Sequence, residues 1–99
     1  MGWVLTALHN AFYCLMRGTD LAEAVSATVG CGGDTDTNAT ICAAPLGAAQ
    51  GREAVPLQWR NAVPSCHPVD RPDVQHPRPT LYWPDDALDL ADSLLVAAR

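Results

Sequence analysis

Two carboxylates and a hydroxyl follow a pair of glycines in the segment Gly32-Gly33-Asp34-Thr35-Asp36-Thr37. Because glycine lets the backbone turn sharply, the side-chain oxygens of Asp34, Asp36 and Thr37 can converge on one point. Hard oxygen donors of this kind favour Mg²⁺, Mn²⁺ or Ca²⁺ over zinc. The three residues are therefore candidate metal ligands.

The same acidic segment has other interpretations. Asp34 and Asp36 could simply cap a following helix and complement its dipole, which is worth about 1 kcal/mol, and the spacing alone does not separate this role from metal binding. A phosphate cradle at the helix start is opposed by the two carboxylates. An EF-hand loop would share Asp34, Asp36 and Asn38 as its first ligands, but it needs a glycine and a glutamate where this chain has Ala39 and Pro45. Helix capping and metal binding therefore both remain as interpretations of the acidic segment, whereas an EF-hand loop is excluded.

Cysteine and histidine side chains offer a weaker alternative site. Cys66, His67 and His76, together with Cys31 or Cys42, include the ligand types of a zinc site, but the chain has no closely spaced CxxC pair. The wide spacing of the cysteines is also unlike a dense disulfide framework. We therefore expect free thiols in a reducing cytoplasm.

Length and charge limit the class of protein. The chain has 99 residues, and its 6 basic side chains, all arginines, are outnumbered by 11 acidic ones, for a net charge of −5. This length allows one domain at most, and the lack of a basic surface argues against binding of nucleic acid. The uncharged stretch from Gly2 to Met16 is shorter than the about 20 residues of a membrane-spanning helix, and no basic residue precedes it. We expect neither a membrane span nor a signal peptide.

Two helices are expected before the acidic segment. The first runs from Trp3 to Arg17 and ends at Gly18, and the apolar residues at helical spacing along it are Val4, Leu8, Ala11, Phe12 and Leu15. The second is capped by Asp20 and stops near Gly30.

The acidic segment opens a third helix that runs towards Gly51. Pro45 inside this helix removes one backbone hydrogen bond and predicts a kink or an early end. A run of small residues predicts close packing against neighbouring helices: Ala43, Ala44, Gly47, Ala48 and Ala49.

The remainder of the chain divides by composition. Residues 1–63 form the helical part with the candidate metal loop, and a short helix is expected from Pro56 through Asn61. Six of the eight prolines lie in residues 64–84, which predicts an extended, mostly irregular segment. Residues 85–99 form the terminal helix, in which Asp85, Asp86, Asp89 and Asp92 are expected to be a solvated acidic face. No alternation typical of strands is present, so the predicted class is all-α.

The string GGDTDTNATICAAPLGAAQG at residues 32–51 resembles the C-terminal signature of the ADP-ribosylglycohydrolase family. The resemblance extends upstream through Gly2-Trp3-Val4-Leu5 and the helix that contains Glu23-Ala24-Val25. Downstream it continues through Val55-Pro56-Leu57-Gln58-Trp59-Arg60 and, more loosely, to Tyr82-Trp83-Pro84-Asp85-Asp86. Departures from the family pattern are Ala43, for a common glycine, and Pro45, for an aliphatic residue.

The resemblance implies an orthogonal all-α domain that holds two Mg²⁺ ions, with Mn²⁺ as an alternative. These ions would bind and orient ADP-ribose, attached to a protein or in a small molecule, while its glycosidic bond is hydrolysed. By position in the motif, Asp34, Asp36 and Thr37 would be metal ligands. The family's other ligands come from an upstream Thr-Asp-Asp triplet, and its candidate acidic catalyst also lies upstream.

No Thr-Asp-Asp triplet occurs in these residues. We therefore expect the chain to be the C-terminal portion of such a domain, with half of the dimetal site, no assigned catalytic residue and no activity alone. A separately encoded N-terminal portion is a possible partner. The alternative is a non-catalytic helical remnant or a small interaction module in which the acidic loop is only a helix cap.

Overall fold

The computed structural model describes residues 3–98, and these are helical or irregular, without a strand. The all-α prediction is confirmed. Gly2, in the predicted family resemblance, and Arg99, at the end of the predicted terminal helix, lie outside the described residues. Within residues 3–98, no helix has both the length and the apolar character that crossing a bilayer requires.

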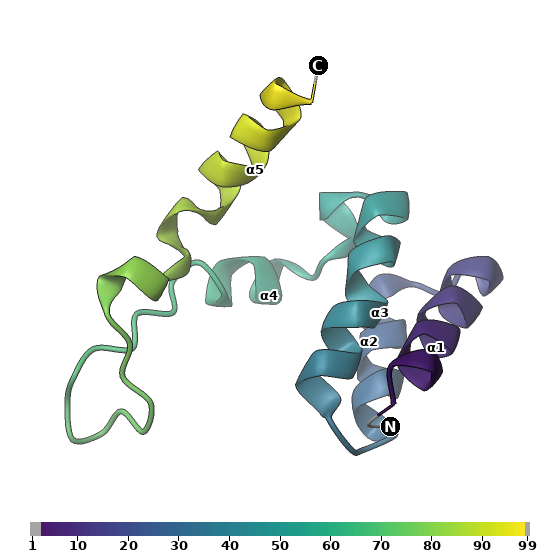
Figure 1. The fold of residues 1–99 in the computed structure, drawn as a ribbon, viewed down its shortest axis with the longest axis horizontal. Helices are drawn as coiled ribbons and strands as arrows, with labels where there is room; N and C mark the ends of the chain where they lie inside the picture. The colour runs from purple at the N-terminus through teal and green to yellow at the C-terminus, as the bar shows by residue number, and fades with distance from the viewer. Residues whose placement is uncertain (1–2, 99) are drawn as a thin grey trace. The chain divides into compact units, whose positions relative to one another are not determined.

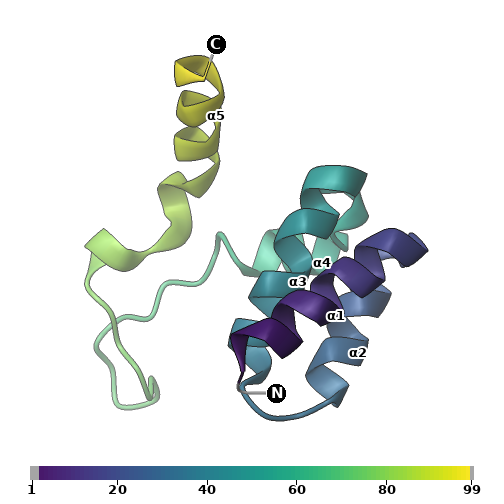
Figure 2. The same cartoon turned by 45° about the vertical axis from the view of Figure 1, so that its right-hand side comes forward.

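The chain divides into two compact units, Met1–Pro56 and Leu57–Arg99. The first unit contains α1 (Val4–Arg17), α2 (Leu21–Gly30) and α3 (Thr35–Gln50), followed by the short 3₁₀ helix η1 (Arg52–Ala54). Helix α3 packs against both α1 and α2 (Figure 1). The first and third helices begin at the same end of the unit, and α2 runs in the opposite direction (Figure 2).

The core of the first unit uses about one residue per helical turn. Most of these side chains are small, which allows the helix axes to approach closely. The buried residues are Ala7, Ala11 and Cys14 from α1, Leu21, Ala24 and Thr28 from α2, and Asn38, Cys42 and Leu46 from α3.

The buried face of α1 is rotated from the one that its apolar spacing predicts, and of the five predicted residues only Ala11 is fully buried. Val4, Leu8 and Phe12 are exposed, with Val4 at 65%, whereas Ala7 and Cys14 are buried. The physical reason is the partner: α3 offers small side chains and accepts a close approach, which Ala7 and Ala11 permit and Phe12 does not. Within residues 3–98, the larger apolar side chains of α1 stay uncovered.

Helix boundaries follow the predicted signals. Gly18 ends α1 with φ of 67°, the left-handed conformation that glycine adopts without strain. The Asp20 carboxylate accepts a hydrogen bond from the Glu23 amide at 3.4 Å and so caps α2. Both predicted boundaries are confirmed.

Pro45 does not end α3 early, so that alternative is wrong. The helix continues to Gln50, and Gly51 ends it with φ of 86°. Directly after the proline, Leu46 is fully buried, and this packing offsets the backbone hydrogen bond that Pro45 cannot make.

The small-residue run of α3 packs only in part. A Cβ on Gly47 would lie 3.8 Å from Leu21 Cδ1, which shows how closely α2 approaches there. Ala44, Ala48 and Ala49 are exposed, so the prediction of close packing is wrong for these three. They fall on the side of α3 that turns away from α1 and α2.

Gln50 ties the three helices together at the end of α3. Its side-chain oxygen accepts a hydrogen bond from the Leu21 amide at 3.0 Å, and its side-chain nitrogen donates to the Thr19 carbonyl at 2.7 Å. One amide therefore satisfies a free donor of the α2 N-terminus and a carbonyl of the α1–α2 turn. A second link joins Asn10 to Thr28, whose hydroxyl accepts from the Asn10 side chain at 2.8 Å.

We expect Gln50→Ala to lower the free energy of unfolding by about 1–2 kcal/mol, because two hydrogen bonds are lost and the Leu21 amide is left without its partner. Urea denaturation followed by circular dichroism measures the change. Gln58→Ala, at an exposed position of α4, is the matched control and should change the unfolding free energy by less than about 0.5 kcal/mol. Equal effects of the two variants would contradict the bridging role of Gln50.

The second unit contains α4 (Leu57–Ala62), the 3₁₀ helices η2 (Thr80–Tyr82) and η3 (Pro84–Asp86), and α5 (Ala87–Ala97). Residues between α4 and η2 are irregular, as the prolines predict. None of the described residues in this unit is fully buried, and the apolar residues of α5 are exposed.

Candidate functional site

The acidic loop lies between α2 and α3, and two glycines shape it. Gly32 and Gly33 have φ of 76° and 75°, a conformation that residues with a Cβ rarely adopt. The chain reverses there, and α3 begins at Thr35 with Asp34 as its N-cap residue. The predicted glycine hinge is present in the backbone.

Asp34 and Asp36 lie close enough for their carboxyl groups to interact. A hydrogen bond with the Asp34 carboxyl lowers the pKa of Asp36, and the backbone amide of Thr37 adds to the effect. Asp36 Oδ1 accepts from that amide at 2.9 Å. A hydrogen bond to the ionised form favours ionisation, so Asp36 keeps its negative charge to a lower pH than an ordinary carboxyl group.

The capping interpretation divides between the two carboxylates. Asp34 makes no side-chain capping hydrogen bond, although it stands at the N-cap position. Asp36 does accept from a free amide of the first turn, and its charge complements the helix dipole. A capping role therefore explains the position of the Asp36 side chain. The side chain of Asp34 has no capping role.

The donor set of this loop fits part of a hard-cation site. The side chains of Asp34, Asp36 and Thr37 are exposed, and a carboxylate keeps lone pairs beyond those used for one backbone amide. In residues 3–98 there is no group of three or more His, Cys, Asp or Glu side chains that could enclose a metal ion. The loop by itself thus offers three oxygen-bearing side chains, about half of what Mg²⁺ requires.

Asn38 was the third residue of the EF-hand comparison, and the structure places it in the core. It is 3% exposed and lies on the face of α3 that also carries Cys42 and Leu46. The four-residue spacing of these three positions is the signal that could have shown this from the sequence.

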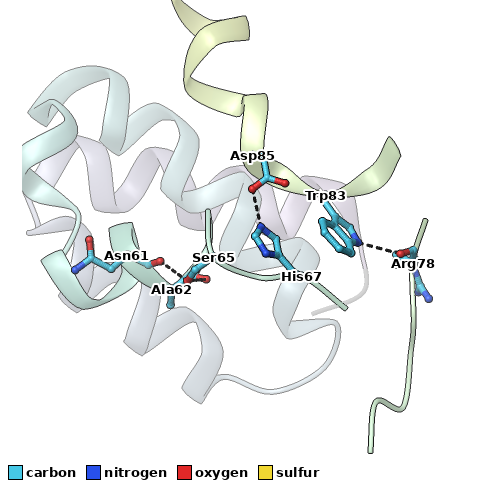
Figure 3. Close-up of polar contacts among 7 residues, drawn as sticks. All are labelled: Asn61, Ala62, Ser65, His67, Arg78, Trp83 and Asp85. Atoms are coloured by element: carbon cyan, nitrogen blue, oxygen red, sulfur yellow. Dashed lines mark hydrogen bonds and ion pairs between the residues drawn. The ribbon is translucent and has the colours of Figure 1, made fainter. Parts of the chain in front are cut away.

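The zinc alternative finds no support among the described residues. Cys42 is buried in the first unit, and Cys31 and Cys66 are exposed free thiols. His67 instead contacts Asp85 (Figure 3). Burial and, secondarily, the nearby Cys42 raise the pKa of the Cys14 thiol, so it is held in its neutral form.

The comparisons with known proteins point to one family. The family model for ADP-ribosylglycohydrolase matches residues 1–99. A curated relative, ADP-ribosylhydrolase ARH3 from Xenopus tropicalis, is 38% identical over 64 residues, which is 58% of this chain and 18% of that protein. The chain therefore spans less than a fifth of the length of this relative. The search of solved structures finds no match.

Proposed function

Because the chain belongs to the ADP-ribosylglycohydrolase family, we propose that it supplies the acidic metal-binding loop of a domain that hydrolyses ADP-ribosyl compounds. The substrate class is ADP-ribose joined through a glycosidic bond to a protein side chain, or a related small molecule. The observation that carries the proposal is the loop at residues 32–37, where two left-handed glycines precede paired carboxylates within the matched sequence.

The residues proposed to hold the cation are Asp34, Asp36 and Thr37. A bound Mg²⁺, or Mn²⁺ in its place, supplies orientation of ribose hydroxyls and a lowered pKa for a bound water. Asp36 is suited to this role because it stays ionised into the acid range. The Thr37 amide holds the Asp36 carboxylate in place from one side, and the hydrogen bond between Asp36 and Asp34 keeps the two carboxyl groups adjacent. Asp34, with no capping hydrogen bond, is available to the same cation.

Half of a two-ion site is expected to bind weakly when it stands alone. We expect calorimetric titration of residues 1–99 with Mg²⁺ to show no micromolar binding, because three side chains supply about half of the six oxygens that one ion prefers. The same chain should release no ADP-ribose from a modified protein. The double variant Asp34→Ala/Asp36→Ala gives the background heat for the titration. Two results would contradict the proposal that this chain carries only half of the metal site. One is micromolar affinity for Mg²⁺ that the double variant removes, and the other is release of ADP-ribose by the chain alone.

The proposal extends to partners and location. The partner that completes the site is an upstream portion of the same kind of domain, in the same polypeptide or separately encoded. A cytoplasmic location accords with the four free thiols at Cys14, Cys31, Cys42 and Cys66. Nucleic acid is not a proposed partner, because the chain carries a net charge of −5.

A second candidate function is a non-catalytic helical module in which the loop only caps α3. The hydrogen bond from the Thr37 amide to Asp36 is the observation that favours it. The two candidates differ in what removal of the carboxylate does: capping predicts a loss of about 1 kcal/mol in stability with no effect on catalysis.

A further inference from the structure

Helix α1 has two apolar faces, and only one of them is covered within residues 3–98. The covered face consists of Ala7, Ala11 and Cys14, on the helix that packs against α3. The uncovered face is a row of larger side chains, here called the apolar stripe of α1. Its members are Val4, Leu5, Leu8, Phe12, Leu15 and Met16. Leu15 is half-buried, and the exposed fractions of the other five run from 45% for Leu8 to 83% for Met16.

The stripe is continuous with the covered face. At 3.6 residues per turn, its six positions span about 120° of the helix circumference, and the covered face extends the apolar surface to about 200°. The remaining arc carries the polar side chains Thr6, His9, Asn10, Tyr13 and Arg17. A helix that covers one core needs an apolar arc of about 100°. Helix α1 therefore has enough apolar surface for a second packing partner, beside the one that α3 provides.

The chemistry and size of the stripe indicate what covers it. All six side chains are apolar, so the partner must offer an apolar surface in return. Six residues are far fewer than the about 20–30 per side of a stable interface between separate proteins, which argues against a second copy of this chain. They suit a helix–helix contact inside a larger domain. The match to the curated relative covers 18% of that protein, so most of such a domain lies outside these residues.

We propose that the apolar stripe of α1 is the docking surface for a helix of the upstream portion of the domain. The inference rests on the proposed function, in which that portion completes the metal site. Helices α1 and α3 begin at the same end of the first unit (Figures 1 and 2). Packed helix axes lie about 8–10 Å apart, so a helix docked on the first turns of α1 lies near the end of the unit that carries the acidic loop. Docking on the stripe thus brings the upstream portion to Asp34, Asp36 and Thr37.

Binding of the full 99-residue chain to the upstream portion of Xenopus tropicalis ARH3, added as a separate polypeptide, tests the proposal. The variant Leu8→Glu/Phe12→Glu places two carboxylates on the stripe, at positions that are 45% and 55% exposed in this chain. We expect the dissociation constant to rise by about 100-fold, because two apolar contacts are lost and docking would desolvate the new charges. Isothermal titration calorimetry measures the change.

Thr6→Glu/Tyr13→Glu is the matched control. It adds the same two charges to exposed positions on the polar side of the same helix and also removes an aromatic ring, so it should bind like the wild type.

A second measurement keeps the test decisive if the separate upstream portion does not fold. The urea midpoint of each variant is measured in the 99-residue chain, and the thermal midpoint in one polypeptide that joins the upstream portion to residues 1–99. The stripe variant should leave the first midpoint unchanged and lower the second by at least about 5 °C. The control variant should change neither.

Three results would overturn the proposal. The first is an equal effect of the two variants on binding and on the joined polypeptide. The second is a lower urea midpoint of the stripe variant in the 99-residue chain, which would mean that this chain already covers the stripe. The third is a dimer of the 99-residue chain in sedimentation velocity that only the stripe variant abolishes, while the joined polypeptide is unaffected; the stripe would then belong to a second copy.

Failure of the docking surface and failure of the proposed function give different results. Asp36→Ala should leave binding of the upstream portion unchanged, because Asp36 lies outside the stripe. Binding that depends on the stripe, in an assembled domain that releases no ADP-ribose, would support the docking surface and contradict the hydrolase activity. An active assembled domain that is insensitive to Leu8→Glu/Phe12→Glu would contradict the docking surface alone.

Discussion

Asp36→Ala is expected to lower the rate of ADP-ribose release by about 100-fold or more in a reconstituted complete domain. Loss of residues that only support metal ligands typically costs 10–100-fold in affinity or activity, so loss of a ligand should reach at least the upper end. The measurement is release of ADP-ribose from a modified protein. The domain is assembled from this chain and the upstream portion of a complete family member.

Asp92→Ala is the control for this experiment. Asp92 is an exposed carboxylate on α5, away from the acidic loop in sequence, and its removal should leave the rate unchanged. The thermal stability of both variants is measured in parallel, because Asp36 also accepts a hydrogen bond from the Thr37 amide. Full activity in Asp36→Ala, with only the loss of stability that a missing cap causes, would favour the non-catalytic module.

Leu46→Ala is expected to lower the free energy of unfolding of the first unit by about 3 kcal/mol. Leu46 is 0% exposed and is the last of the three buried residues of α3, and truncation of a buried leucine removes apolar burial and leaves a cavity. A unit of this size has a total stability of only about 3–8 kcal/mol. The variant should therefore be partly or largely unfolded at 25 °C, which urea or thermal denaturation measures.

Leu94→Ala makes the same chemical change at a site that is 70% exposed. It should alter the unfolding free energy by less than about 0.5 kcal/mol. If both leucine variants cost the same, the assignment of Leu46 to the core of the first unit is wrong.

Local signals predicted the helices of the first unit well. Gly18 and Asp20 act within one turn of their own position, so the boundaries that they set can be derived from neighbouring residues alone. The burial of α1 depends on its partner instead. Its apolar spacing indicated Val4, Leu8 and Phe12, but the small side chains of α3 select the face that carries Ala7 and Cys14.

Contacts between distant residues could not be predicted. Gln50 forms hydrogen bonds with Thr19 and Leu21. The sequence pattern of the third helix does not predict these contacts. Asp85 is exposed, as expected for a solvated acidic face, but its contact with His67 across a stretch of irregular backbone was not predicted. Such pairs depend on how the chain closes on itself, which neither periodicity nor capping signals determine.

The backbone turn of the candidate site could be predicted from neighbouring residues. Two glycines followed by acids indicate a sharp turn, and the left-handed conformations of Gly32 and Gly33 have that form. The proximity of Asp34 and Asp36 follows from the same turn. In the proposed function the remaining ligands would come from outside this segment, so the spacing within it could predict only these three ligands.

The central claim is that Asp34, Asp36 and Thr37 bind a divalent cation, and paramagnetic broadening by Mn²⁺ tests it most directly. In this experiment, substoichiometric Mn²⁺ is added to the ¹⁵N-labelled chain, and weak binding is sufficient because exchange is fast. We predict that amide signals of residues 33–38 broaden first and that Asp34→Ala/Asp36→Ala removes the effect. Broadening that is equal at the acidic residues of α5, or unchanged in the double variant, would contradict the claim.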